Sequence, residues 1–170
     1  MKRHSLLPMS IVVLMAGLAR LSAQPPLFTT SLPKEEFAAR RARVLERIAR
    51  HRSSRERLLA VFDGVAETFS QPGYRGCAFV RANAEMPPGS VAKTVCDTAR
   101  GWLHELFTTL AGEAGARNPV ALAQQLMLLY DGALIAAQMD GDVDAAAAAR
   151  GLAASLLDAA TGRARASKRG

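Results

Sequence analysis

The segment VALAQQLMLLYDGALIAAQM, residues 120–139, limits the possible folds more than any other part of the chain. At a helical rotation of about 100° per residue, its apolar side chains do not share one face. The main stripe consists of Leu122, Leu126, Leu129, Ala133 and Ala136. Leu128 and Ile135 lie almost opposite to that stripe. A helix that is apolar on several sides is buried from more than one direction, so we expect it to contact something beyond its own small domain.

Start and stop signals indicate that the chain before this segment is helical too. Pro33 suits the first turn of one helix. Ser53 and Glu56 form a capping box, in which side chains satisfy the free amides at the start of the next helix. The stretch GYRGCAFVRANAEM, residues 73–86, predicts a short third helix, because its two glycines allow a sharp turn into it.

Three longer helices complete the expected fold. One runs from about residue 90 to 114. Asn118 and Pro119, a capping residue followed by a proline, begin the apolar helix. The last helix is expected from about Asp142 to Ala160. No strand pattern is present, so the predicted fold class is all-α, a helical bundle of about six helices.

Composition agrees with a helical domain. A chain of 170 residues is long enough for one domain with a core but hardly for two. Apolar residues make up 49% and charged residues 22%, which excludes wholesale disorder. Aromatic residues are only 5%, and together with the abundant alanine this favours helices over a β-sandwich.

Charge is distributed unevenly along the chain. Residues 1–57 hold 12 basic and 4 acidic side chains, whereas residues 58–160 hold 6 and 11. The tail, residues 161–170, adds 4 basic side chains and no acid, and we expect it to be disordered. Basic ends can meet nucleic acid or an anionic surface, but arginines on a solvated helix give the same pattern.

Residues 1–32 form an atypical N-terminal segment. MKRH, SLLPMSIVVLMAGLA and RLSAQ follow one another as the parts of a secretory signal do. The apolar stretch is too short and too interrupted to span a bilayer, and no membrane partner is expected. Leu21 stands where a cleavage site at Ala23 would need a small residue. A cleaved signal and an ordinary apolar helix therefore both stay open.

Motifs of enzyme and metal chemistry are absent. The chain has no G-x-S-x-G, no phosphate loop and no H-E-x-x-H, and its three histidines are scattered. Cys77 and Cys96 are not closely spaced, so a zinc site is not expected. We predict no enzyme activity and no cofactor. Cys77 is interpreted as a small core residue, with a redox role or a disulfide to Cys96 in an exported chain as alternatives.

The last two helices carry too many apolar sides for one small monomer. Paired with their copies in a second subunit, they would form a four-helix interface. The alternative is a helical hairpin buried entirely within the monomer. We therefore predict a homodimer whose candidate interface residues are Leu128, Gly132, Ile135, Leu152 and Leu156.

A run of phrases resembles the C-terminal regulatory domain of the TetR family of bacterial transcriptional regulators. LLAVFDGV, GYRGCAFVRANAEM and EAGARNPVALAQQLMLLYDGALIAA occur in that family's order and spacing over roughly residues 55–160. LFTTSLPKEEF at 27–37 is similar to the family's link into its first regulatory helix. The resemblance implies that residues 33–160 are a ligand-binding and dimerisation domain, and that the protein is cytoplasmic.

The same resemblance implies an inner pocket for a small apolar or amphipathic effector, whose binding changes the grip of two N-terminal heads on operator DNA. Asn83 is the candidate polar contact, with a structural hydrogen bond as its alternative role. The candidate pocket residues are Phe62, Asn83, Trp102, Phe107, Met127 and Tyr130, and each large one is also suited to plain core.

The front of the chain departs from the family. A three-helix DNA-binding head needs helices of about 8 to 10 residues each, whereas 32 residues precede Pro33 and include LSAQPP, whose prolines forbid a continuous helix. We expect the head to be truncated, scrambled or replaced, so that operator DNA is a partner only where a complete head exists. Two alternatives follow: an exported helical protein, or a headless partner of a full-length regulator.

Overall fold

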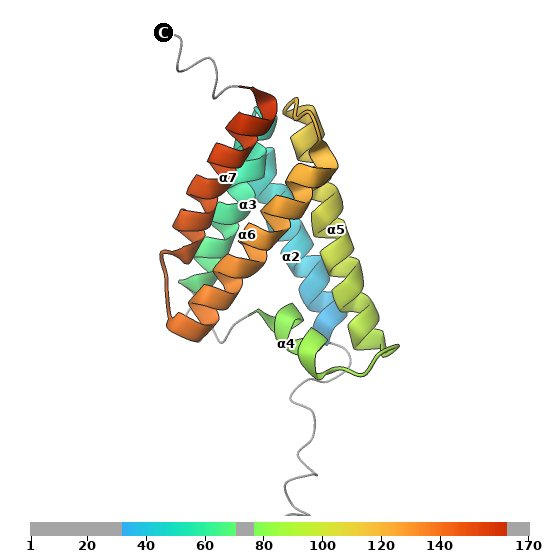
Figure 1. Cartoon of the computed structure of the whole chain (residues 1–170). Coiled ribbons are helices and arrows are strands. Elements are labelled where there is room, and N and C mark those ends of the chain that lie inside the picture. The colour runs from blue at the N-terminus through green and yellow to red at the C-terminus, as the bar shows by residue number, and fades with distance from the viewer. Residues whose placement is uncertain (1–31, 71–76, 163–170) are drawn as a thin grey trace, which may run out of the picture.

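Side-chain caps define where half of the described helices begin. A computed structural model describes residues 32–70 and 77–162. Within these residues there are six helices and no strand, as the sequence predicted. They are α2 (Leu32–Ala49), α3 (Ser54–Phe69), α4 (Ala78–Glu85), α5 (Val91–Glu113), α6 (Pro119–Asp140) and α7 (Ala145–Thr161). Figure 1 shows the long helices running lengthwise and the short α4 at the lower end.

The predicted caps are present. The Ser53 hydroxyl accepts the amide of Glu56 at 3.2 Å, and the Asn118 side chain accepts the amide of Ala121 at 3.1 Å. The predicted start of the last helix was wrong by three residues. The chain leaves α6 through Gly141 at a φ of 67°, which favours glycine. Asp142 then accepts the amide of Asp144 at 2.9 Å in a turn before α7 starts.

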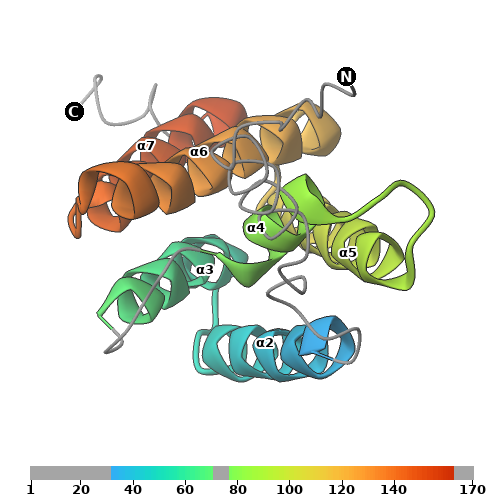
Figure 2. The same ribbon diagram turned by 90° about the horizontal axis from the view of Figure 1, so that it is seen from below.

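The helices form three layers. Figure 2 shows α6 and α7 side by side on one face and α2 on the opposite face, with α3, α4 and α5 between them. The main packing pairs are α6 with α5 and α7, and α3 with α7 and α2. The eight-residue α4 packs mainly on α5. One face of the α6–α7 pair is therefore left on the outside of this chain.

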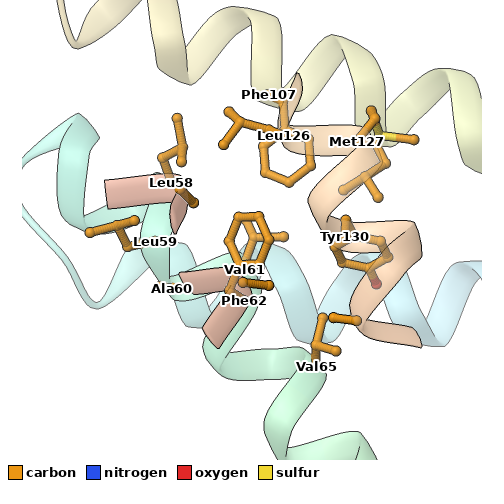
Figure 3. Close-up of a cluster of buried hydrophobic side chains, with 14 of the residues drawn as sticks. Leu58, Leu59, Ala60, Val61, Phe62, Val65, Phe107, Leu126, Met127 and Tyr130 are labelled. Atoms are coloured by element: carbon orange, nitrogen blue, oxygen red, sulfur yellow. The ribbon is translucent and has the colours of Figure 1, made fainter. Parts of the chain in front are cut away.

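An aromatic cluster joins the layers. Phe62 of α3 and Phe107 of α5 have no exposed surface, and their rings stack with centroids 5.8 Å apart. The Tyr130 ring of α6 packs edge-on against both of them at 6.2 and 6.3 Å (Figure 3). Burying an aromatic side chain of this size stabilises the fold by roughly 1.5–3 kcal/mol.

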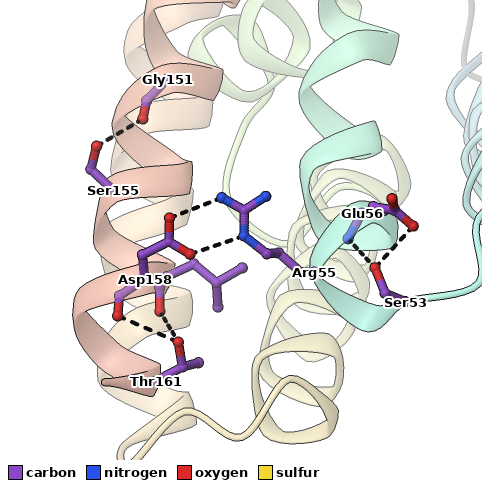
Figure 4. Close-up of polar contacts among 8 residues, drawn as sticks. Ser53, Arg55, Glu56, Gly151, Ser155, Asp158 and Thr161 are labelled. Carbon is purple, nitrogen blue, oxygen red and sulfur yellow. Dashed lines mark hydrogen bonds and ion pairs between the residues drawn. The ribbon is translucent and has the colours of Figure 1, made fainter. Parts of the chain in front are cut away.

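Polar contacts tie the end of the molecule that lies opposite α4. Arg55 donates two hydrogen bonds to the Asp158 carboxylate, both at 2.9 Å, and so joins α3 to α7 (Figure 4). The Ser54 hydroxyl donates to Glu113 at 3.0 Å. The backbone amide of Arg117 donates to the carbonyl of Ala160 at 3.2 Å. We call this group the tied end.

The described residues leave the second apolar side of helix α6 uncovered. Leu128 is 71% exposed and Ile135 is 38% exposed, so the hairpin is not buried entirely within the monomer. Among the described helices, α6 alone is long and apolar enough to cross a membrane, with a mean hydropathy of 1.5 over its best window. The core helix of a soluble protein can also meet these criteria of length and composition.

The predictions for the two ends of the chain are not tested by this structure. Of the N-terminal segment 1–32 only Leu32 is described, and of the tail 161–170 only Thr161 and Gly162. The signal-like stretch and the expected remnant of a DNA-binding head thus lie outside the described residues.

Candidate functional site

Two hollows meet beside α4. The first, of about 470 Å³, lies between α2, α3, α4 and α6. The second, of about 310 Å³, lies between α2, α4, α5 and α6. Each has the size of a site for a small molecule. The residues that line both are Arg40, Cys77, Phe79, Tyr130 and Leu134.

A hydrogen bond between Arg40 and Tyr130 stands where the hollows meet. The Arg40 guanidinium on α2 donates to the Tyr130 hydroxyl on α6 at 2.6 Å. It also lies 5.1 Å from the centre of the Phe79 ring and 5.5 Å from that of the Tyr130 ring. Aromatic rings hold a guanidinium in place without cancelling its charge. Three helices thus fix one cation at the junction.

Both groups of this pair keep their protons near neutral pH. Burial lowers the pKa of Arg40, but the neighbouring Tyr130, Cys77 and Glu36 raise it, and the result lies above the ordinary value. Burial raises the pKa of Tyr130, which outweighs the lowering by Arg40. The pair is therefore a charged guanidinium beside a neutral phenol.

Each carboxylate on the walls of the first hollow forms an ion pair with a base other than Arg40. Glu36 accepts from Arg43 at 3.0 Å, and Glu67 accepts from Arg47. Within the residues that the structure describes, neither of these acids forms an ion pair with Arg40. The first hollow therefore leaves Arg40 without a carboxylate partner.

The second hollow repeats this arrangement. Asp97 accepts from Lys93. Asp131 accepts two hydrogen bonds from Arg100, at 2.6 and 3.1 Å, which raise the pKa of Arg100. Arg40 is thus the one base on these walls, within residues 32–70 and 77–162, without a carboxylate of its own.

The structure separates the predicted pocket residues into three groups. Asn83, Met127 and Tyr130 line the second hollow, and Asn83 makes no side-chain hydrogen bond to the described residues. Phe62 and Phe107 lie in the closed aromatic core and line neither hollow.

Trp102 lies elsewhere. Its ring packs edge-on against Phe37 at 6.0 Å, and the Arg41 guanidinium lies 5.9 Å from its centre. The sequence reasoning missed Arg40 and Phe79. Arg40 is one of several arginines on α2, and nothing in the local sequence distinguishes it.

Cys77 packs against the hydrophobic core and also borders the hollows. It is the residue before α4, is half-buried, and lines both hollows. Cys96 is buried and lines the second hollow, where burial raises the pKa of its thiol. Both cysteines are free thiols in this structure. Within the described residues, no group of three or more His, Cys, Asp or Glu side chains could hold a metal ion.

The predicted interface residues lie on the outer face of α6 and α7. Leu128, Ile135 and Leu152 are exposed, and Leu156 is half-buried. Gly132 lies among them with open space where a side chain would project. The exposed apolar residues of this face, which we call the outer apolar face, are Leu128, Ile135, Met139, Val143 and Leu152.

The fold is that of known transcriptional regulators. No family model matches the sequence, and no curated protein matches it. The structure is similar to that of a TetR-family transcriptional regulator from Streptomyces coelicolor, with a TM-score of 0.69 and 24% identity over 76% of this chain and 69% of that one. It is also similar to a protein from Streptomyces avermitilis assigned as a TetR transcriptional regulator, with a TM-score of 0.60 and 27% identity over 91% and 87%.

These similarities confirm the resemblance that the sequence showed and support a role in the regulation of transcription. Both similar proteins are regulators by their descriptions, and neither is described as an enzyme.

Proposed function

We propose that this protein, whose fold is that of the TetR-family transcriptional regulators, is a cytoplasmic regulator of transcription that pairs with a second copy of itself and responds to a small amphipathic effector. Operator DNA would be the third partner. The head that contacts it would precede α2, outside the described residues. The described helices would supply pairing and effector binding.

The outer apolar face is the observation that carries this proposal. Leu128 and Met139 are 71% and 76% exposed. Large apolar side chains that face water contribute no burial free energy to the fold, and a group of them marks an interaction surface. On α6, residues 128, 132, 135 and 139 are spaced as in the seam of two packed helices. Gly132 would let the backbone of a partner helix approach closely, because nothing lies within 4 Å of an added side-chain carbon. Two α6–α7 pairs would make a four-helix interface.

The hollows beside α4 support the second part of the proposal. They join apolar walls to a small number of polar groups, which is the usual build of a small-molecule site. They are formed by α2, α3, α4, α5 and α6, so a ligand there would contact helices from all three layers. Effector binding could therefore shift the layers relative to one another and alter the separation of two heads in a dimer.

The test is the mass of the purified protein in solution. We expect a dimer by sedimentation at micromolar concentration. A variant with Leu128→Glu and Leu152→Glu should be monomeric, with the dimer dissociation constant raised on the order of a hundredfold or more, because four carboxylates would be buried in one interface. Both residues are exposed, so helix content by circular dichroism should stay unchanged.

Val91→Glu is the matched control, because Val91 on α5 and Leu152 on α7 have nearly the same exposed fraction, 57% and 56%. Val91 lies outside the outer apolar face. This variant should remain dimeric. A wild-type protein that is monomeric at micromolar concentration would contradict the proposal, and so would a control that dissociates as readily as the double variant.

A further inference from the structure

We propose that the effector is an organic carboxylate with an apolar body, and that Arg40 and Tyr130 hold its carboxylate where the two hollows meet. This inference rests on the proposed function, since it names the chemical class of the ligand that the regulatory domain binds. It is carried by two polar groups that the described residues leave incompletely partnered.

Arg40 is the first of these groups. Every carboxylate that lines the hollows is matched to a different base: Glu36 to Arg43, Glu67 to Arg47, Asp97 to Lys93 and Asp131 to Arg100. Within the described residues, the only hydrogen-bond acceptor of the Arg40 side chain is the Tyr130 hydroxyl, which is neutral. A guanidinium has five N–H donors, so most of those of Arg40 stay available. Glu36 is near enough to raise the pKa of Arg40, but among the described residues no carboxylate is directly paired with it, and a partly buried cation in that state favours an anion beside it.

Tyr130 is the second group. Its side chain is 7% exposed, and its oxygen accepts from Arg40. Within the described part of the chain, the proton of that hydroxyl has no acceptor. A buried donor without an acceptor destabilises the fold, because the free energy of desolvating the donor is not offset by a hydrogen bond. Because the hydroxyl already accepts a charged hydrogen bond, its own proton becomes a better donor.

The two groups together match a carboxylate. Arg40 can donate to one oxygen and the Tyr130 hydroxyl to the other, from donors that are themselves hydrogen-bonded at 2.6 Å. A phosphate dianion would bring a second negative charge, but the remaining bases on these walls are already paired with acids. One cation and one neutral donor fit a monoanion.

The walls determine the rest of the ligand. Val44, Val61 and Val65 line the first hollow, and Leu103 and Met127 line the second. Phe79 lies at the junction and packs on Arg40 at 5.1 Å. An aryl or alkyl chain attached to the carboxylate would bury its apolar surface against these side chains.

The test compares ligands that share one apolar body and differ in the charge of the head group. Calorimetry would measure the binding of 4-phenylbutyrate, the neutral 4-phenylbutyramide and the cationic 4-phenylbutylamine to the full chain. We expect the carboxylate to bind at least about tenfold more tightly than the amide, since hydrogen bonds to charged groups are the stronger ones. The phosphate ester of 4-phenylbutanol would distinguish a preference for carboxylates from a preference for any anion.

Variants assign the preference to the pair. Arg40→Met should abolish the preference for the carboxylate over the amide, and Tyr130→Phe should reduce it severalfold. Arg41→Met is the matched control: Arg41 neighbours Arg40 on α2 but lies over the Trp102 ring and lines neither hollow, so the preference should persist. Circular dichroism would verify the fold of each variant.

Other outcomes overturn the inference. Equal binding of carboxylate and amide, or tighter binding of the amine, would leave an effector site without an anion requirement, and only this inference would fail. The same holds for tighter binding of the phosphate ester. Absence of binding by all probes at millimolar concentration would remove the pair's role in ligand binding, whereas pairing through α6 and α7 would be judged separately by sedimentation.

Discussion

Two arginines at opposite ends of the bundle have nearly opposite surroundings. At the tied end, Arg55 donates two hydrogen bonds to Asp158 at 2.9 Å, and these hydrogen bonds raise the pKa of Arg55. At the end near α4, Arg40 donates to a phenol at 2.6 Å and lies over two aromatic rings. Both join helices that are far apart in the chain. Among the described residues, Arg55 forms an ion pair with a carboxylate and Arg40 does not.

This difference separates two uses of the same side chain. A guanidinium paired with a carboxylate contributes to the stability of the fold, because its removal leaves the acid without its strongest donor. A guanidinium without a carboxylate partner contributes less to the stability of the fold, and it remains able to bind an external anion. Stability and binding are therefore assigned to different ends of one small domain.

The largest expected effect comes from the aromatic core between the ends. Phe62→Ala removes a ring with no exposed surface and should lower the free energy of unfolding by about 3–5 kcal/mol. The loss should appear as one cooperative transition in urea, followed by circular dichroism, because the ring contacts helices of both ends. Two separated transitions would mean that the two ends unfold independently, as two domains, and would contradict the description of one domain with two specialised ends. The half-buried Phe37 provides a control, since Phe37→Ala should cost less than half as much.

Replacement of each arginine by methionine tests the comparison directly. Arg55→Met should lower the free energy of unfolding by about 2 kcal/mol, because two charge-assisted hydrogen bonds are lost. Arg40→Met should leave the stability of the ligand-free protein unchanged or raise it by about 1 kcal/mol, since an unbalanced charge is exchanged for an apolar side chain of similar size. Urea denaturation of both variants measures the difference. Equal losses would show that Arg40 is structural as well.

The helix caps give a smaller contrast. Ser53→Ala should cost about 1 kcal/mol, because the Ser53 hydroxyl caps α3. Cys77 holds the same position before α4 but makes no side-chain hydrogen bond as a cap. Cys77→Ser should therefore add roughly 0.5–1 kcal/mol of local stability to α4. Hydrogen exchange of the α4 amides measures this gain, and unchanged protection would show that capping does not limit α4.

The smallest effect is a pH dependence at the tied end. Hydrogen bonds from Ser53 lower the pKa of Glu56 in the folded protein below its ordinary value of 4.5. A lowered folded-state pKa contributes stability that is present above the unfolded pKa and is lost as pH falls through the folded value. Glu56→Gln should remove this part of the acid sensitivity in denaturation curves recorded at several pH values. An identical acid sensitivity in the variant would be inconsistent with the Ser53 contact.

Local features of the fold were predictable from the sequence, and distant ones were not. The caps Ser53 and Asn118 act on amides three residues away, so each defined a helix start correctly. The start of α7 was missed because Asp142 closes a turn before the helix. An aspartate in such a turn looks, in the sequence alone, like the residue that caps a helix start.

The candidate site was predictable only in part. Tyr130 was a candidate for the pocket that the family resemblance implies, and it lines both hollows. Its partner Arg40 is 90 residues away in the chain, and only the packing of α2 against the rest brings the two together. The outer apolar face was easier to predict, because the helical period alone places Leu128 and Ile135 on a second side. Its role in pairing stays a prediction.

The short α4 has a consequence for how such a protein can change over generations. It supplies Phe79, Val80 and Asn83 to the hollows, yet it has only eight residues and packs mainly on α5. The outer apolar face belongs to α6, α7 and the turn between them, and it shares Ile135 with the lining of the second hollow. Substitutions in α4 can therefore alter which compound is recognised while the partner of the chain stays the same. Descendants could acquire a new chemical signal through a few changes in this one segment and keep the assembly that reads it.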